Sequence, residues 1–93
     1  MQIIQTNSFR KAAKKLPKGL KKELDKAVLA IIENKEIGTL KVGDLAGIRV
    51  YKFKLNNQNS LLAYSYNDET IILTLLALGS HENFYRDLKR TEF

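Results

Sequence analysis

The chain has 93 residues, which leaves room for one domain of ordinary size. It contains no cysteine and one histidine, which excludes a disulfide framework and thiolate chemistry and leaves little from which to build a metal site. No long apolar stretch is present, so we expect neither a signal peptide nor a membrane span. We therefore expect residues 1–93 to form a single cytoplasmic domain that uses no cofactor and no metal.

The positive charge of the chain is concentrated near its N-terminus. The sequence has 16 Lys and Arg against 10 Asp and Glu, a net charge of +6. The stretch 10–26 alone contains eight basic and two acidic residues, which equals the whole surplus. Such a surface can bind nucleic acid, an acidic protein or an anionic membrane. Membrane docking is the weakest of these, because the apolar helix faces are needed to cover a sheet, and RNA is the polyanion that we expect.

The first third of the chain predicts a short strand followed by a helical hairpin. Two isoleucines among polar residues at positions 3–4 predict the strand, and the Thr6-Asn7-Ser8 cluster can cap the helix that follows. Apolar residues recur at helical spacing across 9–16, with basic residues on the other face. Pro17 suits the first turn of a second, longer helix that fades between Asn34 and Gly38, both good C-terminal signals.

The remaining chain predicts three strands and a last helix. Residues 48–55 are rich in β-branched and aromatic side chains, 61–66 form a further strand, and 71–78 are almost wholly apolar, as in a central strand covered on both faces. Polar residues between them predict turns, Gly79 is expected to end the last strand, and 82–90 can form a helix. The expected fold is α+β, in the order β-α-α-β-β-β-α, with a small, mostly antiparallel sheet packed by the helical hairpin and a C-terminal helix.

A pair of lysines forms the first candidate site. Lys52 and Lys54 are two residues apart on a predicted strand, so they project from one face, as a phosphate-binding pair would. An ordinary solvated strand face carries the same pattern. Arg49 and Arg86 could each bind a phosphate through a bidentate fork or pair with a nearby aspartate. Strand parity places Arg49 on the face opposite Lys52, which argues against a site that they share.

A histidine and a tyrosine form the second candidate group. His81 lies just beyond the apolar strand, where functional groups are frequent, and histidine is suited to proton transfer near neutral pH. A capping or surface histidine would look the same. Tyr85 follows four residues later, on the side of His81 if the last helix begins early. Its alternative role is that of an aromatic anchor between that helix and the sheet.

The order and spacing of several motifs resemble the RelE/ParE superfamily of bacterial type II toxins, and most of all its RelE branch. The Tyr-Lys-Phe-Lys-Leu run at 51–55, its Leu-Ala-Gly lead-in at 45–47 and the spacing on to Tyr64 match the RelE pattern. The Gly-Ser-His ending at 79–81, with Tyr85 four residues after the histidine, is instead similar to the YafQ-like members. The resemblance covers nearly the whole domain, although no single motif is highly specific.

The resemblance implies an enzyme that cuts messenger RNA on the ribosome without metal, using the ribose 2′-hydroxyl as nucleophile on the adjacent phosphate. Lys52 and Lys54 match lysines of the RelE site, where one could act as base and the other as electrostatic stabiliser. His81 is the candidate acid on the leaving oxygen. Tyr85 would orient or stack on a base.

The resemblance also implies partners. A cognate antitoxin would neutralise the basic face, and the ribosome with its messenger RNA would be the target. We expect the helical hairpin to dock on phosphates through five lysines. These are Lys14, Lys15, Lys18, Lys21 and Lys22.

Two positions depart from the RelE pattern. Leu61 stands where RelE has a phosphate-binding arginine on its third strand, and Asp87 stands where RelE has a tyrosine in its last helix. Two alternatives to an RNase therefore stay open. One is a ParE-like inhibitor that binds DNA gyrase and catalyses nothing, and the other is a weakly active module kept as the partner of an antitoxin.

Overall fold

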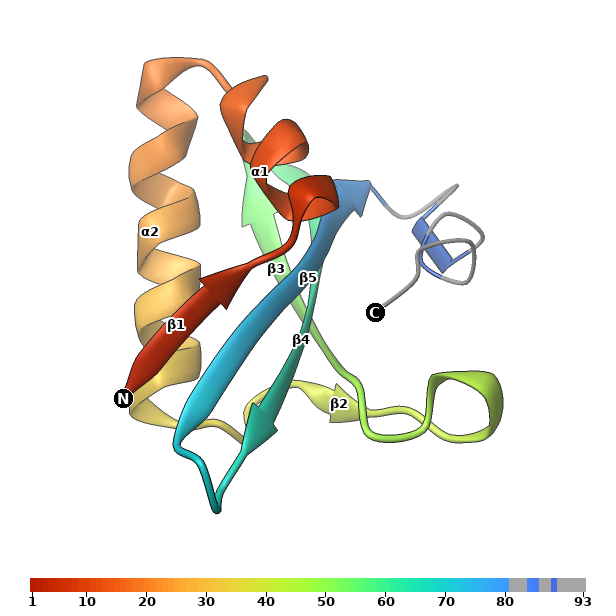
Figure 1. Cartoon of the computed structure of the whole chain (residues 1–93). Helices are drawn as coiled ribbons and strands as arrows, with labels where there is room; N and C mark the ends of the chain where they lie inside the picture. Colours follow the sequence, from red (N-terminus) through yellow and green to blue (C-terminus); the bar gives the residue numbers. More distant parts are fainter. Residues whose placement is uncertain (81–83, 86–87, 89–93) are drawn as a thin grey trace.

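The computed structural model describes residues 1–80, 84, 85 and 88. Within them, a five-stranded sheet has the strand order β1-β5-β4-β3-β2, and two helices pack against one face (Figure 1). β1 runs parallel to β5 and the other neighbours are antiparallel, so the expected α+β fold with a mostly antiparallel sheet is confirmed. The elements are β1 (Gln2–Gln5), α1 (Asn7–Lys14), α2 (Lys18–Glu33), β2 (Thr39–Leu40), the 3-10 turn η1 (Gly43–Leu45), β3 (Arg49–Leu55), β4 (Gln58–Asn67) and β5 (Ile72–Ser80).

Thr6 joins β1 to α1 and fixes both. Its hydroxyl accepts a hydrogen bond from the Phe9 N–H at 3.1 Å and donates one to the Leu76 carbonyl at 2.6 Å. The first bond is the helix cap expected from the sequence, a contact that typically contributes about 1 kcal/mol. The second bond ties the start of α1 to β5, the strand along which this helix packs.

The face of the sheet under α1 and α2, here called the helix face, is covered by a continuous apolar cluster. The helices contribute Phe9, Leu24 and Ile31, which are at most 5% exposed. The strands contribute Leu62, Tyr64, Leu73 and Leu75. The amphipathic pattern of both helices therefore predicts the side on which they pack.

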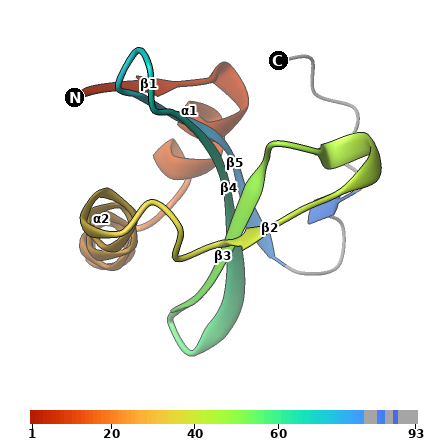
Figure 2. The same ribbon diagram turned by 90° about the horizontal axis from the view of Figure 1, so that it is seen from below.

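The opposite face of the sheet, here called the far face, carries a second apolar cluster. Figure 2 shows the loop between β2 and β3 on the side away from α1 and α2. The cluster combines this loop with the strands and the C-terminal segment, through Leu45, Ile48, Val50, Leu61, Ala63, Leu76, Ala77, Phe84 and Leu88. β5 is therefore covered on both faces, as its apolar sequence predicts.

The hairpin between β3 and β4 is tighter than the sequence predicts. β4 begins at Gln58 rather than at residue 61, because the chain reverses within two residues. These residues, Asn56 and Asn57, have φ angles of 50° and 64°. Positive φ at both central positions is the geometry of a type I′ turn, which asparagine adopts more easily than most residues. The polar segment that reads as a turn thus lies mostly within the strand.

β5 is displaced from its predicted bounds at both ends. Ile71 lies outside the strand, in the left-handed region with φ 57°, and β5 begins at Ile72. Gly79 does not end the strand, which runs on to Ser80. A Cβ at Gly79 would lie 3.4 Å from the Phe84 ring, so the glycine leaves room for that ring against the sheet. The two-residue strand β2 was not predicted.

The C-terminal helix expected over 82–90 lies mostly outside the described residues. Phe84, Tyr85 and Leu88 are described and are helical. Phe84 and Leu88 are buried on the far face, as predicted for the inward side of this helix. In the part of the chain that the structure describes, no helix is long and apolar enough to cross a membrane.

Candidate nucleic-acid interface

β3 presents a pair of lysines on the far face. Tyr51 and Phe53 turn toward the helix face, where their rings stack with centroids 5.8 Å apart and an interplanar angle of 9°. Lys52 and Lys54 alternate with them and are exposed on the other side. The sequence expectation that the two lysines share a face is therefore confirmed, and the face is the one that α1 and α2 leave open.

A leucine stands beside this pair. In the antiparallel register of β3 and β4, Lys52 lies opposite Leu61 and Lys54 lies opposite Asn59. Leu61 is 3% exposed and belongs to the far-face cluster. The position at which the resemblance expects a phosphate-binding arginine thus holds a packed apolar side chain.

Tyr85 lies on the same face of the sheet as the lysine pair. Its ring packs against the far-face cluster and meets Phe84 edge to face, with centroids 5.4 Å apart. The Nζ of Lys41 lies 5.1 Å from the centre of the Tyr85 ring, within the range of a cation–π contact. The packing of the ring is what the anchor alternative expects, its role in stacking on a base stays a prediction, and the ring lies beside a cation that the sequence did not single out.

Lys41 is placed by the loop that connects β2 to β3. Its backbone N–H donates to the Ile48 carbonyl at 2.9 Å, which closes the base of the loop. Gly43 and Gly47 have φ angles of 69° and 86°, a conformation that costs glycine little and other residues more. Leu45 is buried in the far-face cluster and holds the loop against the sheet. No local sequence pattern joins Lys41 to Tyr85, because only this long-range packing brings them together.

Arg49 lies on the helix face, away from Lys52 and Lys54, as strand parity predicts. Its Nη1 donates to the carbonyl of Gly38 at 2.9 Å and to that of Glu36 at 3.4 Å. The guanidinium thus holds the segment that leads from α2 into β2. The structure does not bring Arg49 together with the candidate site.

Tyr64 completes this structural network behind Arg49. Its hydroxyl donates to the Lys35 carbonyl at 2.7 Å and accepts from the Gly38 N–H at 3.0 Å. Burial raises the pKa of Tyr64, an effect that the Gly38 hydrogen bond and the positive charge of Arg49 partly oppose. A Cβ at Gly38 would lie 2.9 Å from the Tyr64 ring, so only glycine allows the backbone this close.

The lysines predicted to dock on phosphates are all exposed, and those that line a hollow do not all line the same one. Lys15 lines a cleft with Lys11, on the side of α1 that faces the end of β5. Lys14 and Lys21 line a different groove, which runs between the two helices and β1 and also holds Asp25. The remaining two, Lys18 and Lys22, are exposed on α2.

Two of the predicted site residues, His81 and Arg86, lie outside the described residues. Their roles stay predictions from the sequence. Among the residues that the structure describes, no group of three or more His, Cys, Asp or Glu side chains could hold a metal ion.

Comparison with known proteins supports the fold. A family model described as "ParE-like toxin of type II bacterial toxin-antitoxin system" matches residues 3–89. No curated protein matches the chain. Solved structures of the same fold include a free mutant of the Escherichia coli toxin RelE, with a TM-score of 0.70 and 20% identity over 96% of this chain and 90% of that one.

Two toxin-antitoxin complexes share the fold as well. The intact E. coli RelBE complex has a TM-score of 0.68 and 22% identity over 87% of this chain and 96% of the matched chain. The RelBE2 complex from Mycobacterium tuberculosis has a TM-score of 0.60 and 19% identity over 86% and 96%. Since the family model spans nearly the whole sequence, the chain belongs to the ParE-like toxins of type II bacterial toxin-antitoxin systems, within the RelE/ParE superfamily.

Proposed function

We propose that this toxin is a metal-independent endoribonuclease that cleaves messenger RNA on the ribosome and so inhibits translation. The observation that carries the proposal is the placement of Lys52, Lys54 and Tyr85 on the same face of the sheet, with Lys41 over the Tyr85 ring. Cations and an aromatic ring on one face suit a single-stranded RNA substrate, because cations bind phosphates and a ring stacks on a base. The shared fold with RelE supports the same reading.

The chemistry is an internal transesterification. The 2′-hydroxyl loses its proton to a base and attacks the adjacent phosphorus, and the bond from phosphorus to the 5′-oxygen breaks. The products are a 2′,3′-cyclic phosphate and a 5′-hydroxyl, whose oxygen takes a proton from an acid. We assign the base and the stabilisation of the pentacoordinate phosphate to Lys52 and Lys54, and the acid to His81.

Two macromolecular partners follow from this proposal. The toxin would be held against ribosomal RNA phosphates in the cytoplasm by Lys14, Lys15, Lys18, Lys21 and Lys22. A cognate antitoxin would neutralise the basic surface. Solved relatives of this fold are complexes of RelE with its antitoxin RelB, which supports such a partner here.

Induced expression tests the proposal in cells. Wild-type toxin should arrest growth and leave transcripts cut within codons, and purified toxin should cut messenger RNA on ribosomes. Changing Lys52, Lys54 and His81 together to alanine should abolish both effects. Circular dichroism checks that the triple variant still folds. We expect the two lysine substitutions to be tolerated, because both side chains are exposed. Growth arrest with intact transcripts would contradict the proposal.

An inhibitor of DNA gyrase without catalytic activity is the second candidate. Two points favour it: the matching family model is described as ParE-like, and the resemblance to RelE implies an arginine at the position of Leu61. The triple alanine variant separates the candidates. If it stays toxic and DNA supercoiling stalls, the toxin acts on gyrase, whereas weak toxicity of the wild type without antitoxin would indicate a module kept mainly as an antitoxin partner.

A further inference from the structure

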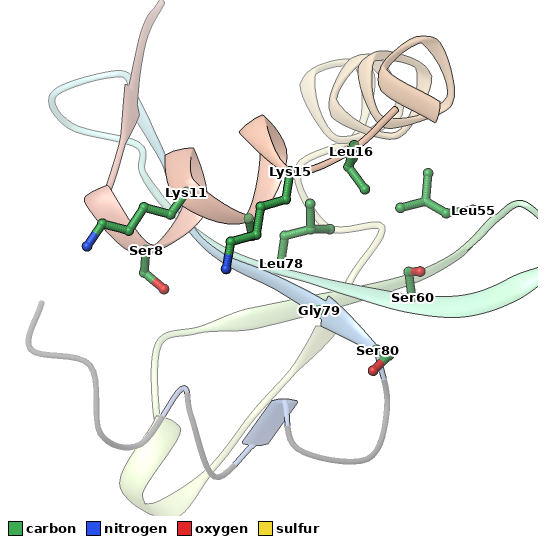
Figure 3. Close-up of a pocket in the computed structure, with 10 residues that line it drawn as sticks. Ser8, Lys11, Lys15, Leu16, Leu55, Ser60, Leu78, Gly79 and Ser80 are labelled. Carbon is green, nitrogen blue, oxygen red and sulfur yellow. The ribbon is translucent and has the colours of Figure 1, made fainter. Parts of the chain in front are cut away.

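A cleft lies between α1 and the end of the sheet formed by the hairpin of β3 and β4 and by the last residues of β5. Its volume is about 390 Å³. Its floor is apolar, and its polar lining consists of two lysines and three serines (Figure 3). The polar residues are Ser8, Lys11, Lys15, Ser60 and Ser80. It opens on the helix face and is distinct from the lysine pair on the far face.

The two ammonium groups of the cleft come from one helix. Lys11 and Lys15 are four residues apart on and directly after α1, and Figure 3 shows both side chains extending from the helix in the same direction. α1 contains no acidic residue, and neither lysine forms an ion pair or hydrogen bond with another described residue. Like charges at this spacing destabilise a helix by a few tenths of a kcal/mol. Nothing in the described protein offsets this repulsion inside the cleft.

The serine hydroxyls are the second group of donors. Ser60 and Ser80 lie directly opposite each other in the register of β4 and β5, so their side chains are neighbours. Ser60 as a whole residue is only 7% exposed, and it lines the cleft. Among the described residues no fully buried side-chain oxygen lacks a hydrogen-bond partner, so the Ser60 hydroxyl is not an orphaned group, and the open side of the cleft is where a ligand can reach it.

The charge of the lining separates this cleft from the other groove beside α1. No carboxylate lines it, whereas the groove at Lys14 and Lys21 contains Asp25. Ammonium and hydroxyl donors without a carboxylate favour an oxyanion over a cation or a neutral ligand. Phosphate is an oxyanion that lysines commonly bind through such charge-assisted hydrogen bonds.

We infer that this cleft binds a backbone phosphate of RNA through Lys11, Lys15 and the serine hydroxyls. It lies near the candidate catalytic face, because Lys54 pairs with Asn59, the residue before Ser60, at the same end of the sheet. Ser80 directly precedes His81 in the sequence. An RNA strand that passes over this end of the sheet would place one phosphate in the cleft. The choice of RNA as the ligand rests on the proposed function, but the anion site rests on the lining alone.

Binding to RNA that cannot be cut tests the inference. The probes are a single-stranded 2′-O-methyl oligonucleotide, which lacks the nucleophile, and ribosomes with an empty A site. The double variant Lys11→Ala, Lys15→Ala is compared with Lys26→Ala, Lys35→Ala, which removes the same charge outside the cleft. We expect the first variant to bind about tenfold more weakly than the second, as for lost charge-assisted hydrogen bonds.

A second variant adds a negative charge to the cleft and leaves both lysines unchanged. Ser8→Glu places a carboxylate in the cleft and in the first turn of α1, where a negative charge stabilises the helix. It removes less positive charge than the control, yet it should weaken binding more. Amide chemical shifts of Leu78 to Ser80 should also move when inorganic phosphate is added to the wild type, and should move less in Ser8→Glu.

The two probes distinguish the sources of the phosphate. Weaker binding of the oligonucleotide identifies a messenger phosphate, and weaker binding of the ribosome alone identifies a ribosomal one. If both cleft variants bind both probes as the control does, the inference is wrong. Because no cleavage is measured, a failure of the proposed nuclease activity would leave these outcomes readable.

Discussion

Lys52 and Leu61 face each other across β3 and β4, an exposed cation directly opposite a leucine that is 3% exposed. The lysine carries charge on the far face while its neighbour anchors the apolar cluster beneath. An arginine in place of Leu61 would add a second cation beside Lys52 for binding an RNA phosphate. In this protein the side chain at that position packs in the far-face cluster instead.

Leu61→Arg is therefore expected to destabilise the fold rather than simply to restore a RelE-like site. The substitution removes a buried apolar side chain and sets a guanidinium opposite Lys52, where like charges repel. We expect the free energy of unfolding to fall by about 2–4 kcal/mol, measured by urea denaturation. Leu61→Met, which conserves volume, should cost less than about 1.5 kcal/mol. Equal stabilities of the two variants would show that the site at residue 61 is open.

The contact between Lys41 and Tyr85 predicts an effect on RNA cleavage. Lys41→Met removes the cation over the Tyr85 ring, so binding of RNA at this ring should weaken. We expect KM for ribosome-bound messenger RNA to rise about tenfold with a smaller change in kcat, and Lys41→Arg to behave as the wild type.

Lys35 offers a matched control for this prediction. Its Nζ lies 5.2 Å from the centre of the Tyr66 ring, nearly the geometry of Lys41 on Tyr85, but outside the far-face cluster. Lys35→Met should change stability by a similar small amount and leave KM as it is. A rise in KM in both variants would trace the effect to lost net charge.

The sequence predicts those parts of this protein that depend on local periodicity. The helical faces that bury Phe9 and Leu24, and the alternation that exposes Lys52, follow from spacing along one element. The cation at Lys41 could not be predicted, because it depends on a loop whose shape is set by contacts far apart in the chain. The cleft lined by Ser60 could not be predicted for the same reason, because it lies between α1 and strands that come much later in the sequence.

Turn conformation accounts for the errors in strand bounds. The five polar residues after β3 read as a loop, yet two asparagines suffice to reverse the chain when both adopt positive φ. At the start of β5, hydropathy assigns Ile71 to the strand, while its backbone belongs to the turn before it. Hydrophobic patterns report burial and carry no information on the sign of φ.

Tyr64 predicts a dependence of stability on alkaline pH. Burial raises its pKa above the ordinary value of 10.0, so the folded state favours the neutral phenol. Its contribution to stability is complete below pH 10.0 and is lost as the pH rises through the raised pKa. Tyr64→Phe leaves the Lys35 carbonyl and the Gly38 N–H without their partner, which should cost about 1–3 kcal/mol near neutral pH.

The dependence of stability on pH separates two effects of Tyr64→Phe, the loss of the phenol hydrogen bonds and the loss of a group that titrates. Urea unfolding of wild type and Tyr64→Phe should show a constant difference in free energy at neutral and mildly alkaline pH. The difference should shrink above pH 10.0, because only the wild type must keep the phenol protonated. A difference that grew with pH would contradict the direction of the pKa shift.

Ile71 is expected to be a site at which substitution stabilises the protein. Its φ of 57° is unfavourable for a β-branched residue, and its side chain is 50% exposed, so little packing holds it there. The turn keeps its shape through the Ile71 N–H, which donates to the Asn67 carbonyl at 2.8 Å. Ile71→Asn retains that bond with a residue that tolerates this conformation, and should raise the free energy of unfolding by about 1 kcal/mol.

Ile3 supplies the control for this last substitution. It is 42% exposed in β1 and is not among the described residues with positive φ, so Ile3→Asn makes the same chemical change without relief of strain. Asparagine is unfavourable in a strand, and the control should be neutral or destabilised by up to about 1 kcal/mol. Urea denaturation of both variants measures the difference. If the two substitutions shift stability alike, the conformation of Ile71 carries no strain, and its position outside β5 costs the fold nothing.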